Sequence, residues 1–412
     1  MIPRLPRRVC LLLFALAVAA RVAAVAAAGF HTVGFGDARA YLGAAAVLSQ
    51  TGRYPLRTDA FFFRPPAYPV FLVAATLGHP DRIPIAKIAN AVLGGVSPVL
   101  LAAISLRIFR SRALALWTGA LAAFHPAFLL VCSDIQSEPL FLLFLLSSGY
   151  VLLAATDRPS TNLALAAGAL LALAALTRAS ALALAPFLAS PLLDRHYPWR
   201  LRGHLAAAGL AGFFLVLAPW TIRNAMVFGR LIPVSDMGGS TFYDGNSDWT
   251  RRYYRLKNRE EYERWVVAFD SDKKRQIAAL AETEPAAAAS PSEYFGRLAI
   301  HQVLADPGAA LTLDARKALD WLRPFPSRWF WPPLVVVSVA VLYSLLFILA
   351  GLGLAIAPRP GVSRFVLVFL AATMAIHVAS LVVWRYRVPY WDPVLLLYAP
   401  AGARRLFGAR IS

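Results

Sequence analysis

The stretch VCLLLFALAVAARVAAVAAA, residues 9–28, is the first of several long apolar runs in this chain. A helix needs roughly 17–25 apolar residues to cross a bilayer, and this run has that length. The 412-residue chain is 59% hydrophobic and 15% charged, whereas a soluble protein carries about a quarter charged residues. The pattern therefore predicts an all-α polytopic membrane protein.

The basic residues Arg4, Arg7 and Arg8 precede this first run, which is also the arrangement of a secretory signal peptide. Arg21 would interrupt the apolar core of a signal sequence, and many further apolar runs follow. We therefore expect a retained first span that begins in the cytoplasm.

Arginines recur between the later apolar runs, where they serve as signals for cytoplasmic loops. This placement accounts for the formal net charge of +19 without nucleic acid as a partner. We expect about nine to ten spans; after the first, they are 84–106, 113–132, 139–156, 161–177, 179–193, 204–220, 331–357, 365–383 and a marginal run from Pro393. On this topology Cys10 and Cys132 lie at opposite faces, so we expect both to be packing residues rather than a disulfide.

The spans divide the chain into three predicted parts. Residues 1–222 form an N-terminal transmembrane module with outer loops at 29–83 and 133–138, in which the apolar segment after Pro69 is too short to cross and is interfacial or re-entrant. Residues 223–328 are rich in charge and aromatic rings and are expected to form a small, mostly helical extracytoplasmic subdomain that ends in an amphipathic segment. Residues 329–412 form a C-terminal transmembrane segment.

The stretch FGDARAYLGAAAVL, residues 35–48, places Asp37 just beyond the first span. Two other carboxylates, Asp134 and Glu138, lie on the same predicted outer side. Ionisable groups at membrane depth usually face a cavity or a partner. The basic residues at outer span ends are Arg64, Arg178, Arg223, Arg385 and Arg387. Because arginine binds phosphate in a bidentate way, this composition predicts a phosphate-bearing substrate beside a proton acceptor.

Each of these residues also has a structural interpretation. Asp37 precedes an alanine-rich helix and is a favoured N-cap residue. Glu138 precedes Pro139, which favours a first helical turn, so Glu138 can serve the helix dipole. The arginines can be interface anchors that extend to lipid headgroups. Five arginines and three acids at one face favour the functional interpretation.

Other chemistries lack sequence support. The histidines are scattered and show no metal-ligand spacing; His31 lies near Asp37, and His125 precedes Pro126. The motifs GxxxxGKS, GxGxxG, CxxC and GxSxG do not occur, so nucleotide hydrolysis, redox chemistry and serine hydrolysis are not indicated.

Several motifs, in order along nearly the whole chain, resemble the GT-C glycosyltransferases of the family 39 type. This group includes bacterial relatives of the protein O-mannosyltransferases and the lipid A aminoarabinose transferase. The matching stretches are GDARAYLGAAAVLSQTGRYP, RPPAYPVFL, SDIQSEPLFLLFLL, LTRASALALAPFL, APWTIRNAMVFGRLIPVSDMGGSTFYDGNS and RYRVPYWDPVLLL.

The resemblance implies a multi-pass enzyme of the cytoplasmic membrane that transfers a sugar, with inversion and at the outer face, from a polyprenyl phosphate. It implies that Asp37 is the general base on the acceptor hydroxyl and that Arg64 holds the lipid phosphate. Many members have Asp-Glu where this chain has Asp37-Ala38, and some carry an acidic metal ligand where this chain has Phe63. Metal dependence therefore stays open.

The remaining expectations complete the predicted site. The other four outer arginines are expected to assist Arg64, and the substrate pocket is expected to include Tyr41, Tyr68, Tyr243 and Asn246. Apolar neighbours such as Phe35 and Ala40 are expected to raise the proton affinity of Asp37. Two other functions stay open: a transporter or flippase that moves a charged lipid-linked substrate without chemistry, and a structural membrane subunit. The acceptor, whether lipid, glycan or protein, and the sugar are not specified.

Overall fold

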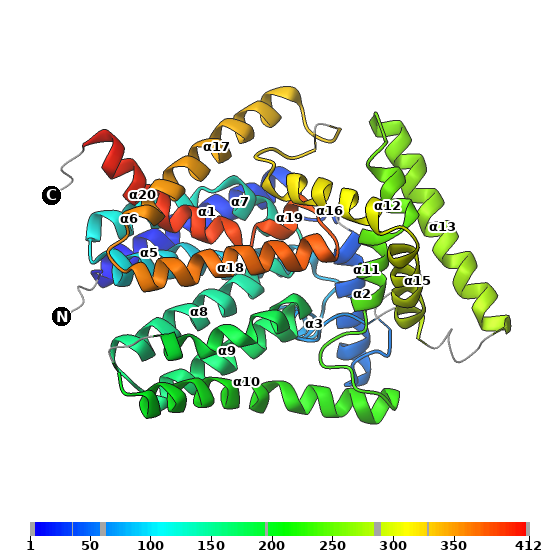
Figure 1. Ribbon diagram of the computed structural model, residues 1–412, viewed down its shortest axis with the longest axis horizontal. Helices are drawn as coiled ribbons and strands as arrows, with labels where there is room; N and C mark the ends of the chain where they lie inside the picture. Colours follow the sequence, from blue (N-terminus) through cyan, green and yellow to red (C-terminus); the bar gives the residue numbers. More distant parts are fainter. Residues whose placement is uncertain are drawn as a thin grey trace.

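In the computed structural model, the described part of the chain comprises residues 5–34, 36–57, 63–193, 197–283, 290–327 and 329–408. These residues form helices and no strand. Most of the long helices run in roughly the same direction and form a bundle, while α11–α16 gather at one end of it (Figure 1). The predicted all-α membrane architecture is confirmed.

The first half of the bundle contains α1 (Arg7–Ala28), α4 (Ile83–Gly94), α5 (Val96–Phe109), α6 (Arg112–Ala123), α7 (Pro126–Cys132), α8 (Glu138–Asp157), α9 (Thr161–Thr177), the 3-10 helix η1 (Ala179–Leu193) and α10 (Trp199–Phe228). Between α1 and α4, the chain forms α2 (Gly36–Thr51) and α3 (Ala67–Ala75). Figure 1 shows α2 lying across the end of the bundle that faces α11. The nine-residue α3 is too short to cross a bilayer, as the sequence predicts.

The 223–328 region is mostly helical, as predicted, although α10 extends six residues into it. It contains α11 (Gly238–Asn246), α12 (Asp248–Tyr253), α13 (Arg259–Thr283), α15 (Pro291–Ala305) and α16 (Pro307–Leu322). The chain then returns to the bundle through α17 (Pro333–Ala355), α18 (Pro360–Ala379), the four-residue α19 (Trp384–Arg387) and α20 (Trp391–Phe407). We refer to α11–α16 as the subdomain.

Six helices are long and apolar enough to cross a membrane: α1, the continuous α4–α5 unit, α8, α10, α17 and α18. The α6–α7 pair makes a seventh span if its 48° bend lies within one crossing. The other predicted spans are α9, η1 and α20, which have 17, 15 and 17 residues. Two of these helices lie at the lower limit of roughly 17 residues for a spanning helix. Among the described residues, six or seven helices thus have the length and composition of full spans, against the nine to ten expected, and shorter apolar helices accompany them.

Glycines allow two helix pairs of the bundle to pack at close range. A side chain added at Gly168 of α9 would lie 1.8 Å from the carbonyl oxygen of Gly209 in α10. One added at Gly402 of α20 would lie 1.9 Å from the carbonyl oxygen of Leu349 in α17. Small residues let helix backbones approach in this way inside membranes. Helix α20 is buried along most of its length, from Trp391 to Gly402.

Arg21 ties α1 to the bend between α6 and α7. Its guanidinium is fully buried and donates to the carbonyl oxygens of Ala122 and Ala123 at the end of α6. Pro126 begins α7, so these carbonyls lack the donors of a continuous helix. An arginine inside an apolar run thus has a packing role.

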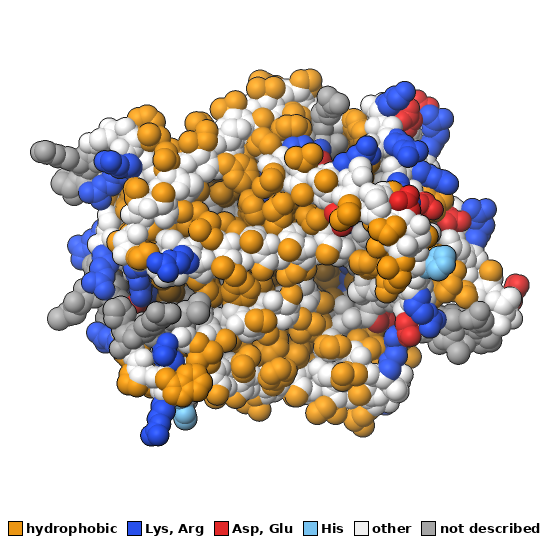
Figure 2. Space-filling model, viewed as in Figure 1, with side chains coloured by type: hydrophobic (Ala, Val, Ile, Leu, Met, Phe, Trp, Pro, Cys, Tyr) orange, Lys and Arg blue, Asp and Glu red, His pale blue; other side chains and the backbone are white. Residues whose placement is uncertain are grey.

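The two ends of the bundle differ in charge. Helix α1 begins and α20 ends on the side away from the subdomain (Figure 1). Figure 2 shows apolar side chains over the middle of the molecule, Lys and Arg side chains at that end, and Lys and Arg together with Asp and Glu at the subdomain end. Asp157 pairs with Arg107 and Arg359 at 2.9 Å each.

Candidate active site

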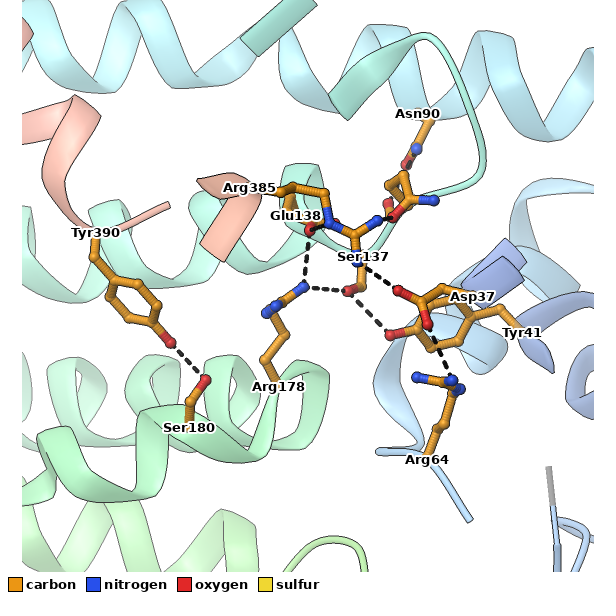
Figure 3. A network of polar contacts seen from close by, with 11 residues as sticks. Asp37, Tyr41, Arg64, Asn90, Ser137, Glu138, Arg178, Ser180, Arg385 and Tyr390 are labelled. Atoms are coloured by element: carbon orange, nitrogen blue, oxygen red, sulfur yellow. Dashed lines mark hydrogen bonds and ion pairs between the residues drawn. The ribbon is translucent and has the colours of Figure 1, made fainter. Parts of the chain in front are cut away.

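The site lies where α2, the residues before α3, the start of α8, the end of α9 and α19 meet (Figure 3). Asp37 lies in the first turn of α2, where the positive end of the helix dipole favours a carboxylate. The buried alanines of α2, with Tyr41, pack this helix against its neighbours. Asp37 is thus fixed to the end of the bundle.

Two arginines from distant parts of the chain pair with Asp37. Arg64 Nη2 lies 3.0 Å from Asp37 Oδ1, and Arg385 Nη2 donates to Asp37 Oδ2. The side chain of Asp37 is 28% exposed, and those of Arg64 and Arg385 are 15% and 16% exposed. These three groups therefore line a surface that a ligand can reach. We call Asp37, Arg64, Arg385, Glu138 and Arg178 the charged cluster.

Glu138 connects Arg385 to the third arginine. Its side chain is fully buried, and Oε1 lies 3.2 Å from Arg385 Nε and 3.0 Å from Arg178 Nη1. Arg385 Nη1 also donates to Gln136 Oε1 at 2.7 Å. These contacts hold the Arg385 and Arg178 guanidiniums at fixed positions beside Asp37.

Backbone contacts position Arg64. The Tyr54 hydroxyl donates to the Arg64 carbonyl at 2.8 Å, and Phe63 N donates to Asp236 Oδ1 at 3.0 Å. Phe63 is buried and stacks on Phe228 with ring centroids 4.9 Å apart. Pro65 and Pro66, which follow, restrict the chain before α3 begins. The segment that carries Arg64 is therefore held from both sides.

Polar side chains complete the cluster. The Tyr41 hydroxyl donates to Ser137 Oγ at 3.1 Å, and Arg178 Nη1 donates to the same oxygen at 3.3 Å. The Tyr41 ring lies under the Arg64 guanidinium at 5.4 Å. Tyr68 is buried and packs edge-on against Tyr41, so it supports the site from behind. Gln136 and Ser137 were not predicted as site residues, although both lie in the SDIQSEPLFLLFLL stretch.

The charge environment of Asp37 reverses one expectation. Burial alone raises the pKa of this carboxyl, but Arg64 and Arg385, with Arg178 nearby, hold it below its usual value. The predicted increase in proton affinity from apolar neighbours is therefore wrong for the ligand-free protein. Of the two neighbours invoked, Ala40 is buried, and Phe35 lies outside the described residues.

Asp134 lies beside the cluster and connects the turn before α8 to the segment after α1 and to α4. Its Oδ2 accepts from Gly34 N at 2.9 Å, and Lys87 Nζ lies 3.8 Å from Oδ1. Because α8 begins at Glu138, Asp134 lies in the preceding turn, and the two carboxylates do not share a helical face although they are four residues apart.

Two predicted phosphate-binding arginines lie outside the cluster. Arg387 is buried, donates to the carbonyl oxygens of Trp321 and Arg323, and lies 3.8 Å from Asp392. Arg223 donates to the Tyr54 carbonyl at 3.1 Å and stacks on Trp220. Both arginines therefore contact packing partners in the structure, and neither pairs with Asp37.

Two predicted pocket residues belong to the subdomain. Tyr243 is buried against Phe295 and Phe269. Asn246 donates to the carbonyl oxygens of Ala379 and Ser380 and accepts from Lys317 Nζ at 2.9 Å. Asn246 therefore joins the subdomain to the end of α18, and neither residue contacts the charged cluster.

Within the described ranges, no group of three or more His, Cys, Asp or Glu side chains is arranged to hold a metal ion. The carboxylates of the charged cluster have arginine partners. Cys132 is buried in the bundle, and Cys10 lies near the start of α1; both are free thiols.

Comparisons with known proteins identify the fold. Residues 64–222 match the family model of dolichyl-phosphate-mannose-protein mannosyltransferases. Along 98% of its length the chain superposes on the archaeal oligosaccharyltransferase AglB from Archaeoglobus fulgidus, solved with an inhibitory peptide and a dolichol-phosphate, with a TM-score of 0.54 and 14% identity. The chain has the GT-C fold.

A second A. fulgidus oligosaccharyltransferase structure, a complex with Zn and sulfate, gives a TM-score of 0.55 at 11% identity over 97% of the chain. The chain spans about half the length of these two proteins, 52% and 49%. ArnT from Cupriavidus metallidurans, bound to undecaprenyl phosphate, is also similar, with a TM-score of 0.43, 14% identity, and coverage of 96% of this chain and 77% of ArnT. No curated protein matches by sequence. The resemblance predicted from the motifs is confirmed at the level of the GT-C fold.

Proposed function

We propose that this protein is an inverting membrane glycosyltransferase that moves a sugar from a polyprenyl-phosphate donor to an extracytoplasmic acceptor. The observation that carries the proposal is the Asp37 carboxylate between Arg64 and Arg385, at the subdomain end of the bundle. The family match and the GT-C fold support the reaction class.

The chemistry follows from the residue types. Asp37 takes the proton from the acceptor hydroxyl as that oxygen attacks the anomeric carbon. A positioned base of this kind contributes about 10²–10⁴-fold. Arg64, Arg385 and Arg178 bind the donor phosphate and stabilise the charge that develops on it, by roughly 3–4 kcal/mol per well-placed donor. A nucleotide site is not needed, because the lipid phosphate is the leaving group.

The rest of the proposal concerns the sugar, the acceptor and the location of the protein. The sugar is a hexose or pentose, and the acceptor is a lipid, glycan or protein that approaches from the subdomain. We place the protein in the cytoplasmic membrane, with the charged cluster on the extracytoplasmic face, because the arginine-rich helix ends lie at the opposite end. The alternative, transport of a charged lipid without chemistry, gains no support from the GT-C fold.

The test uses a deletion strain labelled with radioactive sugar precursors. A transferase predicts that one polyprenyl-phosphate sugar accumulates while one surface glycan loses the same sugar. Purified protein reconstituted with that lipid should then release polyprenyl phosphate only when the acceptor is present. Movement of the intact lipid across the bilayer without release would support the transporter instead.

A further inference from the structure

The two arginines that pair with Asp37 are also the cationic groups of the cluster nearest to it. Each contacts a different oxygen of the carboxylate, and each is partly exposed. In the described structure Asp37 thus occupies guanidinium groups that the proposed function assigns to the donor phosphate. The carboxylate and the phosphate therefore compete for the same two cations.

The two carboxylates of the charged cluster differ in how firmly they are held. A sugar–lipid phosphodiester carries a negative charge and would compete with a carboxylate for the guanidiniums of the cluster. Glu138 is fully buried and is held by Arg178 and Arg385, whereas the Asp37 side chain is the more exposed of the two carboxylates. Asp37 is therefore the carboxylate that can give up its partners.

We propose that Arg64 and Arg385 are shared between Asp37 and the lipid phosphate, and that sugar transfer moves these cations from the carboxylate to the phosphate. This inference rests on the proposed function. It adds that Asp37 competes with the lipid before the reaction and stops competing as it takes up the proton.

The step balances in atoms and charge. The acceptor oxygen forms a bond to the anomeric carbon, and the bond from that carbon to the phosphate oxygen breaks with its electron pair on the phosphate. The acceptor proton goes to a carboxylate oxygen of Asp37. The phosphate changes from a monoanion to a dianion while Asp37 becomes neutral, so the total charge beside Arg64 and Arg385 does not change. Neither guanidinium has to be exposed without a counter-charge, which would be costly at a partly buried site.

The competition has a consequence for binding that a base without these ion pairs would not have. When Asp37→Asn removes the negative charge, the Nη2 atoms of Arg64 and Arg385 that pair with Asp37 no longer have that carboxylate as a competitor of the lipid phosphate. This variant should bind polyprenyl phosphate more tightly than the wild-type protein, although it cannot accept the proton. If Asp37 only held the arginines in place, the same substitution would weaken binding.

The experiment measures the affinity of full-length protein in lipid nanodiscs for a polyprenyl phosphate at low ionic strength. We expect about tenfold tighter binding for Asp37→Asn, equivalent to about 1.4 kcal/mol. The matched control is Asp244→Asn in the subdomain. The Asp244 side chain is also 28% exposed and pairs with one cation, Lys273, at 2.8 Å. This control removes the same charge without touching Arg64 or Arg385 and should leave affinity unchanged.

A double-mutant comparison tests whether the gain in lipid affinity depends on Arg385. In an Arg385→Gln background, Asp37→Asn should tighten binding much less, because one of the contested cations is gone. Equal or weaker binding of Asp37→Asn, with its melting temperature preserved, overturns the inference. An undiminished gain in the Arg385→Gln background, or the same gain in the Asp244→Asn control, also overturns it.

The outcomes separate this inference from the proposed function. If the wild-type protein transfers sugar and Asp37→Asn shows no gain in affinity, the inference fails and the function stands. If the wild-type protein neither binds polyprenyl phosphate nor transfers sugar from it, the proposed function fails and the inference fails with it.

Discussion

Arg385 donates to the carboxylate of Asp37, which lies 348 residues earlier in the chain. Helix α2 and the short helix α19 therefore meet in one ion pair at the end of the bundle. Arg385 also reaches Glu138 through Nε at 3.2 Å. One side chain thus connects the proposed base to the buried carboxylate at the start of α8.

The Asp37→Asn substitution distinguishes a role of Asp37 as catalytic base from a role in stabilising α2. Asparagine in the first turn of α2 loses only the charge–dipole interaction, typically about 0.3–1 kcal/mol, but it cannot accept a proton. Asp37→Asn should fold and insert normally, yet lose sugar transfer by a factor on the order of 10² or more. Single-turnover transfer by the purified variant, beside its thermal melt, measures both. Near-normal transfer would falsify the assignment and direct attention to Glu138 or Asp134.

Arg64→Lys tests the geometry of phosphate binding while it keeps the charge. A lysine offers one compact cation in place of a planar fork, so bidentate contact with the phosphate is lost. We expect donor affinity to decrease about tenfold with little change in melting temperature. Titration with labelled polyprenyl phosphate provides the measurement. If Arg64→Ala binds the lipid as well as the wild-type protein does, Arg64 is not part of the phosphate site.

Glu138→Gln should weaken both stability and transfer. The fully buried carboxylate pairs with Arg178 and Arg385, and loss of one partner of a buried pair costs about 3–5 kcal/mol. Glu293→Gln is the control, because Glu293 is 55% exposed and its arginine partners are 3.6–3.7 Å away. Exposed pairs are worth about 0–1 kcal/mol. Equal shifts in melting temperature for the two variants would contradict a structural role for the buried pair.

The pH dependence of sugar transfer should show how the arginines around Asp37 shift the pKa of this carboxyl group. The arginines hold the Asp37 pKa below its usual value, so the carboxylate keeps its charge at lower pH than an ordinary aspartate does. The acid limb of kcat/KM, which reports the free enzyme, should therefore lie below the pH at which an unperturbed aspartate titrates. Loss of one cation in Arg64→Gln should move that limb to higher pH. A limb at the same pH in both proteins would show that another group controls it.

The two-sided topology can be tested with single cysteines. In a background with Cys10→Ser and Cys132→Ala, cysteines are placed at two exposed positions, Ser271 in α13 and Arg110 after α5. Ser271→Cys should react with a membrane-impermeant maleimide in spheroplasts, and Arg110→Cys should react only after the membrane is opened. The reverse pattern would place the charged cluster on the cytoplasmic side.

Features that depend on local sequence were predicted well. Apolar runs define membrane helices because their length and composition alone decide whether they can leave water. Asp37 and Arg64 were expected at the same end by counting spans, and the structure joins them at 3.0 Å. Glu138 and Arg178 were assigned to the same end by counting spans, and the structure joins them at 3.0 Å.

What the sequence could not decide is which charged side chains meet. Arg385 and Arg387 have the same chemistry and lie two residues apart, but in a helix with 3.6 residues per turn they point about 200° apart. Only the orientation of α19 directs Arg385 to Asp37, and Arg387 to Asp392 and to two carbonyl oxygens at the end of α16. The pKa of Asp37 depends on the same contacts, because burial and ion pairing act in opposite directions on a carboxyl group. The sequence by itself determined the helices and the end at which the charged residues gather. The tertiary structure decided the partners, because ion pairing depends on distances between atoms that the chain order does not define.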